Sequence, residues 1–405
     1  MKRLILFLLC SLFVVVGVVF AQDDRLATIE TFSAYLAEIA SAPSEEANVM
    51  LADLWEHLIE TESIPFVRGG DVAFLYRGEA NSVEWRGDFT GWSASADFMG
   101  ERVGETDLWV VYAQFPTTAR LDYKIVLNGN NWILDPNNPY QQMGGFGANS
   151  ELRMGDYAPS PFIVRDEAVA KGRVRGPYRL QSEALGYAVN YSVYLPVGYA
   201  DLDALPTIYV LDGQEYAHDE MGSMVIVLDN LIAQNLISPV IAVFIDPRNV
   251  DNVNQNLREE QYIENPAFAQ FVAEELVFNI DRVFKTSQNA SDRAILGTSL
   301  GGLASAYISV NYPDVFNKVA IQSPAFWVSE TLYGLYEDSN GLALSFIITN
   351  GAPEWDADDI PDFTSVLDVK AYPYTTIEVA EGHSWGNWRG LVDDILIHFW
   401  GITNA

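Results

Sequence analysis

Short apolar runs that alternate with helical patterns dominate the chain after about Lys171, and this alternation is the strongest constraint on its fold. The runs are "TIYVLDG", "VIAVFID", "RAILGTS", "KVAIQSP", "LSFIITNG" and "TIEVAEG". Helical patterns such as "PAFAQFVAEELVFNID" and "GGLASAYISVNY" lie between several of them. Strands that are apolar on both faces belong to parallel sheets covered by helices on both sides. The pattern predicts an α/β domain with a mostly parallel sheet over residues 171–405.

The chain upstream of this domain divides into three parts. Over residues 22–70, apolar side chains recur at helical spacing, and "SAPSEE" separates two predicted amphipathic helices. Over residues 71–157, short strand patterns such as "VAFLYRG" and "LWVVYAQF" follow one another without helices between them, which predicts a small antiparallel β-sandwich. Residues 158–170, which follow in a proline-containing stretch, are predicted to be a linker.

The N-terminal segment has the features of a secretory signal peptide over residues 1–21. Lys2 and Arg3 precede an apolar run, and Val19 and Ala21 occupy the small-residue positions of a cleavage site. We therefore expect a secreted, periplasmic or cell-envelope protein. If the run is not cleaved, its length would also suit a membrane anchor. Elsewhere in the sequence, no segment is apolar enough to suggest a membrane span.

Charge and cysteine content exclude several classes of function. The formal net charge is −32; removing residues 1–21 takes away two basic residues and no acidic one, which leaves 21 basic against 55 acidic residues, or −34. An acidic excess of this size argues against nucleic acid and anionic membrane surfaces as partners. The single cysteine, Cys10, lies in the predicted signal peptide. The mature protein is therefore expected to have no disulfide, no thiolate nucleophile and no cysteine metal site.

A Gly-x-Ser-x-Gly motif, "GTSLG", provides the candidate nucleophile. It lies between the predicted strand "RAIL" and a helix that begins near Leu300, so Ser299 would occupy a strained and exposed turn from strand to helix. In open α/β sheets, ligands bind outside the carboxyl ends of the strands, which is where this turn falls. The backbone N–H of Leu300 would then face a developing oxyanion.

Four histidines are candidates for the base, and His383 is the best placed of them. It follows the predicted strand "TIEVAEG" and lies downstream of Ser299, in the hydrolase order of nucleophile, acid and histidine. His57 and His398 lie in predicted helices and are interpreted as structural. The alternative for His383 itself is a turn histidine stacked between Trp385 and Trp388.

The acid must lie close to the end of a strand to reach the histidine and fix its tautomer. "NGAPEWDADD" follows the strand "LSFIIT", and in it Glu354 is the first candidate and Asp356 the second. A second oxyanion donor is expected from the loop "LDGQE", in the backbone N–H of Gly213 or Gln214. Asp212 would order that loop.

Together, "VLDGQEY", "GTSLGGLAS" and "EGHSWGNWRG" resemble the enterochelin esterase family of the esterase-D-type α/β-hydrolases, to which feruloyl esterases and mycolyltransferases are related. The likeness covers residues 170 to 400 approximately. Upstream, "VEWRGDFTGW" and "DPNNP" are similar to the early-set, immunoglobulin-like domain that precedes the catalytic domain in enterochelin esterases, and also to carbohydrate-binding modules. The resemblance implies a serine esterase with Ser299 as nucleophile, His383 as general base and a carboxylate after "ITNG". This mechanism needs no metal and no organic cofactor.

Three functions remain in competition. The leading hypothesis is a secreted enterochelin-esterase-like hydrolase of a small ester. The acidic excess and the expected export favour a substrate less anionic than a ferric catecholate, so a feruloyl or acetyl-xylan type esterase acting on an acylated carbohydrate is the alternative. A catalytically inert protein that binds glycans through its sandwich is a third reading, against which the intact Ser299 and His383 speak.

The candidate substrate contacts have structural alternatives. Arg389 could meet a substrate carboxylate or phenolate, or pair with one of the many acidic residues. His218 could line the site, or be a loop histidine satisfied by local partners. Trp385 is a candidate contact, or a residue that holds the loop of His383 in place. In the predicted sandwich, three tryptophans could form a platform for stacking sugars, or belong to the core or to a contact between domains: Trp92, Trp109 and Trp132.

Overall fold

The structure is a computed structural model that describes residues 24–354 and 359–402. Two antiparallel helices, α1 (Ile29–Ser41) and α2 (Ser44–Glu60), lie at one end of the molecule. Thr28 caps α1: its side chain accepts from the Thr31 backbone N–H, and the Thr31 side chain accepts in return from the Thr28 N–H. The apolar faces of both helices pack against one face of a β-sheet, as the helical spacing of their apolar residues requires.

Two antiparallel sheets follow the helices and pack face to face. The first sheet has the order β1 (Phe66–Arg68), β2 (Asp71–Arg77), β5 (Leu108–Gln114), β4 (Glu101–Arg102). The second has the order β3 (Val83–Gly87), β6 (Arg120–Leu127), β9 (Gly147–Arg153), β8 (Gln141–Gly144), with β7 (Asn131–Ile133) paired to β6. A core built around Phe74, Trp85 and Tyr123 lies between the sheets. Strand β1 begins within the range 22–70 in which the sequence pattern indicated only helices.

An eight-stranded sheet forms the centre of the C-terminal domain. Its order is β10 (Arg173–Gln181), β11 (Ala188–Leu195), β13 (Ile241–Asp246), β12 (Thr207–Val210), β16 (Arg293–Thr298), β17 (Lys318–Gln322), β18 (Ser345–Gly351), β19 (Tyr374–Val379). In this order, the six strands from β13 to β19 run parallel to one another, whereas β11 is antiparallel to both of its neighbours, β10 and β13. Strands β12 and β16 are buried along their whole length, which explains why their sequences are apolar without alternation.

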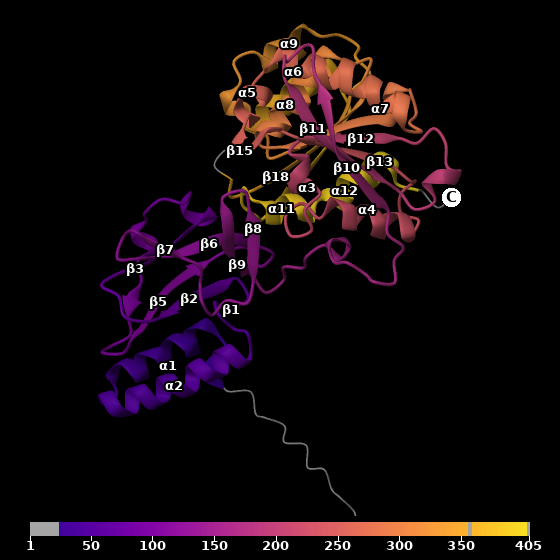
Figure 1. Cartoon of the computed structure of the whole chain (residues 1–405). Coiled ribbons are helices and arrows are strands. Elements are labelled where there is room, and N and C mark those ends of the chain that lie inside the picture. Colours follow the sequence, from indigo (N-terminus) through magenta and orange to yellow (C-terminus); the bar gives the residue numbers. More distant parts are fainter. Residues whose placement is uncertain (1–23, 355–358, 403–405) are drawn as a thin grey trace, which may run out of the picture.

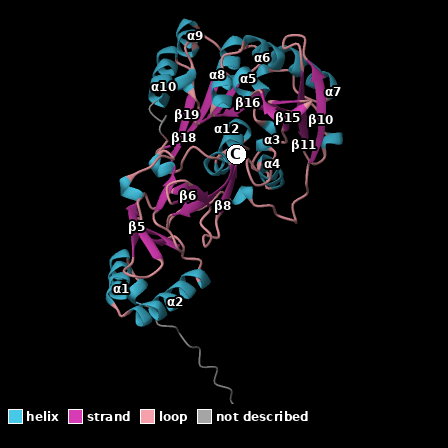
Figure 2. Ribbon diagram, turned by 60° about the vertical axis from the view of Figure 1, so that its left-hand side comes forward, coloured by secondary structure: helices cyan, strands magenta, loops and turns pink. Residues whose placement is uncertain are grey.

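Helices cover both faces of this sheet (Figures 1 and 2). One face packs against α6 (Pro266–Gln270), α7 (Val277–Val283), α8 (Leu300–Asn311), α9 (Leu332–Asp338) and α10 (Asp359–Lys370). The other packs against α3 (Gly213–Tyr216), α4 (Met224–Ala233), α11 (Trp385–Gly390) and α12 (Val392–Trp400). The helix predicted from "PAFAQFVAEELVFNID" is interrupted by a π-helical turn, Phe271–Leu276, between α6 and α7. A hairpin, β14 (Arg248–Asn249) and β15 (Asn252–Asn256), leads into α5 (Arg258–Tyr262).

The sandwich lies between the helix pair and the α/β domain (Figure 1). The connecting residues 158–170 form only a short 3₁₀ turn, Pro161–Ile163, whose side chains pack against the α/β core. The Asn230 side-chain amide donates to the carbonyls of Phe162 at 2.8 Å and Val164 at 2.9 Å, which attaches this connection to α4. Within the described residues, the structure contains no helix with the length and hydropathy needed to span a membrane. The predicted signal peptide lies outside those residues.

Candidate active site

Ser299 occupies the turn between β16 and α8, and its backbone is held in an uncommon conformation. Its φ is +55° and its ψ is −120°, which for a residue other than glycine costs roughly 1–3 kcal/mol. The conformation is fixed by neighbours: the Ser299 N–H donates to the Gln322 carbonyl at 2.9 Å, and the Ser299 carbonyl accepts from the Ala325 N–H at 3.0 Å. A Cβ atom on Gly297 would lie 2.2 Å from the Gly301 carbonyl oxygen, so this turn requires glycine there.

His383 lies in the loop between β19 and α11, as the sequence predicted, with one ring nitrogen facing a carboxylate. Its Nδ1 is 3.0 Å from Oε2 of Glu354, the first-choice acid from sequence. The imidazole is packed edge to face against the Trp388 ring, with centroids 5.0 Å apart. Both tryptophan side chains of this loop, Trp385 and Trp388, are buried and so fix the path of the backbone around His383.

Glu354 is buried behind His383, just after β18, and the carboxylate oxygen that does not face the imidazole, Oε1, accepts three hydrogen bonds. Oε1 accepts from the Gly351 N–H at 2.8 Å, the Ser323 hydroxyl at 2.7 Å and the Asn387 amide at 3.0 Å. Only Oε2 is therefore left to face the imidazole, which fixes the orientation of the carboxylate. Asp356, the alternative acid, lies outside the described residues.

Ser299 and His383 line the same cavity, which has a volume of about 860 Å³. Its wall is formed by both domains. The α/β domain supplies Asp212, Glu215, Asn256, Arg258, Glu259, Thr298, Leu300, Ser384, Trp385 and Trp388 in addition to Ser299 and His383. The sandwich supplies Trp92, Asp122, Lys124, Trp132, Asn149 and the segment Gly144–Gly147.

The two candidate oxyanion loops are tied together by Arg258, which sequence reasoning missed. Its Nε donates to both carboxylate oxygens of Asp212, at 2.9 and 3.0 Å, and its Nη2 donates to the Thr298 carbonyl at 2.9 Å. Arg258 thus joins the loop before Gly213 to the turn that carries Ser299. A Cβ on Gly213 would lie 2.3 Å from the backbone of β13, so only glycine fits.

Leu300 is in the cavity wall, whereas Gly213 and Gln214 are not among the residues that line it. The residues on either side of them in sequence, Asp212 and Glu215, do line the cavity. Burial raises the pKa of the Asp212 carboxyl, although Arg258 opposes this. Burial, with the Asp212 charge, also raises the pKa of Glu215, which accepts from the Trp385 indole N–H at 3.1 Å.

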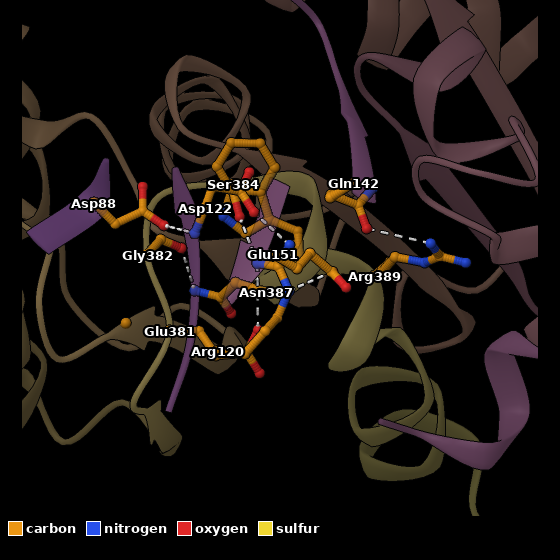
Figure 3. Close-up of polar contacts among 12 residues, drawn as sticks. Asp88, Arg120, Asp122, Gln142, Glu151, Glu381, Gly382, Ser384, Asn387 and Arg389 are labelled. Carbon is orange, nitrogen blue, oxygen red and sulfur yellow. Dashed lines mark hydrogen bonds and ion pairs between the residues drawn. The ribbon is translucent and has the colours of Figure 1, made fainter. Parts of the chain in front are cut away.

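Of the three predicted substrate contacts, Trp385 lines the cavity and the other two do not. His218 Nδ1 accepts from the Glu220 N–H at 3.2 Å in its own loop. The Arg389 guanidinium points toward the sandwich, where it donates to Gln142 Oε1 at 3.3 Å, and it also donates to the Glu220 carbonyl at 3.4 Å. Arg389 therefore joins the two domains through Gln142 and does not line the cavity (Figure 3).

The sandwich tryptophans are divided between the cavity and the core. Trp92 and Trp132 line the cavity, whereas Trp109 is buried in the sandwich core. Phe146, in the turn of the β8–β9 hairpin, also lines the cavity and is fully exposed. Phe146 was not predicted as a cavity residue. Its setting in "MGGFGA" is a usable signal, because a glycine-flanked turn has no core in which to bury the ring.

A serine on a strand-to-helix turn, a histidine after the last strand and a carboxylate after the strand before it define an α/β-hydrolase. The model of the esterase family, described as "Putative esterase", matches residues 182–399, more than half of the chain. The chain therefore belongs to this family and is a hydrolase of carboxylic esters.

Several individual proteins are similar to this chain in structure or sequence. The structure of ferric enterobactin esterase from Salmonella typhimurium matches with a TM-score of 0.71 at 20% identity, covering 85% of this chain and 98% of that one. The uncharacterized protein YjcH of Bacillus subtilis is 26% identical over 227 residues, which are 53% of this chain and 92% of YjcH. An endo-1,4-beta-xylanase/feruloyl esterase of Xylanibacter ruminicola is 27% identical over 163 residues, which are 37% of this chain and 22% of that protein. The predicted α/β-hydrolase fold and the predicted likeness to enterochelin esterases are confirmed.

Proposed function

We propose that the protein is a serine esterase of the enterochelin-esterase-like type that works through an acyl-enzyme. Ser299 is the nucleophile, His383 the general base, and Glu354 the acid that holds His383 in the correct tautomer. The observation that carries the proposal is the 3.0 Å contact between Glu354 Oε2 and His383 Nδ1, with Ser299 and His383 on the wall of one cavity. With Nδ1–H donated to the carboxylate, the other ring nitrogen, Nε2, carries no proton and can accept one.

The reaction follows from these roles. Ser299 Oγ attacks the ester carbonyl carbon while its proton passes to His383 Nε2. The N–H of Leu300, a residue of the cavity wall, stabilises the oxyanion, and one such donor is typically worth about 3–4 kcal/mol. The second donor is the N–H of Gly213 or Gln214, which lie between the cavity-lining Asp212 and Glu215 but do not line the cavity themselves. The carbon–oxygen bond to the alcohol breaks, and the alcohol leaves with the proton from His383. Water, activated by the same imidazole, then hydrolyses the acyl-enzyme and restores Ser299.

The cavity favours an ester of low negative charge. Its wall carries four carboxylates, Asp122, Asp212, Glu215 and Glu259, against the two cations Lys124 and Arg258. Arg258 is already paired with Asp212. A strongly anionic ferric catecholate would meet an acidic wall here, whereas a feruloyl or acetyl ester of a sugar would not. The exposed rings of Trp132 and Phe146 also suit a planar acyl group or a sugar face. An acylated carbohydrate is therefore the second candidate substrate.

The first test is a panel of esters on the purified mature protein, with p-nitrophenyl butyrate, a feruloylated sugar and a catecholate trilactone in parallel. We expect hydrolysis by the wild type and none by Ser299→Ala, which should remain folded by circular dichroism. Unchanged turnover in Ser299→Ala would refute the nucleophile. The panel also separates the two substrate classes. Labelling by a fluorophosphonate probe distinguishes an active esterase from an inert glycan-binding protein, since only an activated serine reacts.

We further propose that the protein is exported and that the sandwich, residues 71–157 with the preceding strand β1, is an early-set immunoglobulin-like domain. Export is supported by the signal-peptide pattern of residues 1–21. The domain assignment is supported by the two facing antiparallel sheets and their shared core. N-terminal sequencing of the protein recovered from the medium or periplasm tests export: cleavage after Ala21 supports it, and an intact N-terminus in the membrane fraction supports the anchor instead.

A further inference from the structure

The loop that carries His383 is attached to the sandwich domain by its backbone. The Arg120 N–H, at the first residue of β6, donates to the Ala380 carbonyl at 3.1 Å. Arg120 and Glu381 form a parallel β-bridge, so the chain leaving β19 continues briefly as a partner of the sandwich. His383 lies two residues beyond this bridge. Its backbone path is therefore set in part by a domain to which it does not belong.

The side chain of Arg120 also connects the sandwich to the loop that carries His383. The guanidinium is fully buried, and its Nη1 donates to Ser384 Oγ at 3.0 Å, next to His383 (Figure 3). Ser384 is the N-cap residue of α11, a position from which a serine usually caps its own helix, yet it makes no capping hydrogen bond there. Its hydroxyl is used by Arg120 instead. On the sandwich side, Arg120 is held by Glu151, at 2.7 Å from Nε, and by Asp122.

Two glycines near His383, Gly382 in the loop and Gly386 in α11, are explained by this contact. A Cβ on Gly386 would lie 1.8 Å from Arg120 Cζ, and a Cβ on Gly382 would lie 2.0 Å from the Asp88 carboxyl carbon. Asp88 is itself fixed, because it accepts from the Asp122 N–H at 2.7 Å and from the Trp92 indole at 3.1 Å. The sandwich thus reaches the loop on both sides of His383, and any larger residue at either glycine would force the loop away.

Stability alone is a weak reason for this arrangement. A buried guanidinium with several carboxylates around it loses hydration, and replacing such clusters by apolar residues of similar volume is often neutral or stabilising. The guanidinium forms a fork of hydrogen bonds, in which one nitrogen donates to Ser384 and the other two donate to Asp122 and Glu151. An apolar side chain could not supply this geometry. Fixing the position of a catalytic group is a role for which that geometry matters.

We propose that Arg120 is a positioning residue for catalysis: from the sandwich domain it holds the His383 loop at the distance and orientation that proton transfer from Ser299 requires. The proposal rests on the proposed function, because it assigns Arg120 a role only if His383 is the base. It makes the sandwich a part of the catalytic machinery as well as of the cavity wall. Arg120 does not touch the reacting atoms, and its effect is expected in kcat and not in KM.

The test compares Arg120→Lys with Arg153→Lys in the full-length mature protein, using p-nitrophenyl butyrate. Arg153 is the matched control, since it also pairs with Glu151, through Oε2, but is partly exposed. Lysine keeps the charge of Arg120 but cannot form the fork. We expect kcat of Arg120→Lys to fall by about 100-fold, the loss typical of a catalytic group misplaced by about 1 Å, with KM changed by less than about threefold. Arg153→Lys should keep wild-type values.

Ser384→Ala provides a second variant in case Arg120→Lys does not fold, because it removes the contact from the loop side and leaves the sandwich intact. It should lower kcat by about tenfold, as expected for partial loss of the positioning. The rate of fluorophosphonate labelling should fall in parallel in both variants, since it reports activation of Ser299 without substrate binding. A folded Arg120→Lys or Ser384→Ala with wild-type kcat, or a loss confined to KM, would overturn the proposal. Inactivity of the wild type, or activity of Ser299→Ala, would instead refute the proposed function itself.

Discussion

Glu354→Gln is the sharpest test of the proposed triad, because the substitution keeps the shape of the side chain and changes only what faces the imidazole. In the wild type, Oε1 accepts three hydrogen bonds and Oε2 faces His383 Nδ1. In the variant, the three donors select the amide oxygen at the Oε1 position. The amide NH₂ then points at Nδ1 and donates to it. His383 is forced into the tautomer that carries its proton on Nε2, from which it cannot accept a proton from Ser299.

The size of the effect follows from those contacts. Turning the amide over to restore the correct tautomer would set its NH₂ against Gly351, Ser323 and Asn387, and would lose roughly 1 kcal/mol for each hydrogen bond, about 3 kcal/mol in all. That keeps the productive arrangement below about 1% of the population, since about 1.4 kcal/mol corresponds to a factor of ten. Loss of the negative charge, which stabilises the imidazolium in the transition state, lowers kcat further. We expect a total loss of about 10³- to 10⁴-fold.

The measurement is kcat for p-nitrophenyl butyrate with wild type, Glu354→Gln and Asp356→Asn, with thermal unfolding to show that each is folded. Asp356→Asn is the control, because Asp356 was the alternative acid from sequence. It should keep kcat within about twofold, as is usual for a residue outside the triad. If Glu354→Gln keeps more than a tenth of wild-type kcat, or if Asp356→Asn shows the larger loss, Glu354 is not the acid and the reasoning above is wrong.

Two further predictions concern the cavity rim and the cluster at the domain boundary. Phe146→Ala should raise KM for a feruloyl ester by about two- to tenfold at unchanged kcat, since stacking on an aromatic ring is worth about 0.5–1.5 kcal/mol. An equal change for a small aliphatic ester, or no change, would contradict a binding role. Burial raises the pKa of Glu381 from 4.5 to about 7, with Glu151 and Asp122 adding to the shift and Arg120 opposing it. The folded state then binds more protons than the unfolded state between pH 4.5 and 7, so the free energy of unfolding should be highest below the lower value and fall as pH rises through the upper one. Urea unfolding at pH 5, 6 and 7 should show this fall, and Glu381→Gln should reduce it by up to about 1 kcal/mol per pH unit; an unchanged slope would contradict the shift.

The three residues proposed as catalytic share one property: each follows a strand of a parallel sheet. Because carboxyl ends of parallel strands meet at one edge, the order of strands and turns in the sequence places Ser299 after β16, Glu354 after β18 and His383 after β19 close together. The preference for Glu354 over Asp356 had the same basis, namely closeness to the strand end. The strand ends thus indicate where the candidate catalytic residues lie from local pattern alone.

The residues that sequence reasoning missed depend on packing between segments that no local pattern connects. Arg120 opens an ordinary amphipathic strand, "RLDYKIVL", and nothing in that strand indicates that the arginine is buried or that it reaches Ser384, 264 positions away. Gly382 and Gly386 resemble loop glycines selected for turning, whereas the structure shows that they admit Asp88 and Arg120. Conversely, Arg389 was a reasonable substrate contact by position, but it contacts Gln142 of the sandwich and does not line the cavity.

His383 is held by two sets of contacts that control different degrees of freedom. In the proposed triad, Glu354, fixed inside the α/β domain by Gly351, Ser323 and Asn387, is the group that decides which ring nitrogen carries the proton. Arg120 fixes where the loop backbone lies. The family match covers residues 182–399, which include all three proposed catalytic residues but not Arg120. Because kcat depends on position as well as on protonation, a hydrolase domain separated from its sandwich would retain the correct tautomer and lose the placement. On this proposal, the α/β domain carries the esterase motif and the sandwich domain completes the geometry around it.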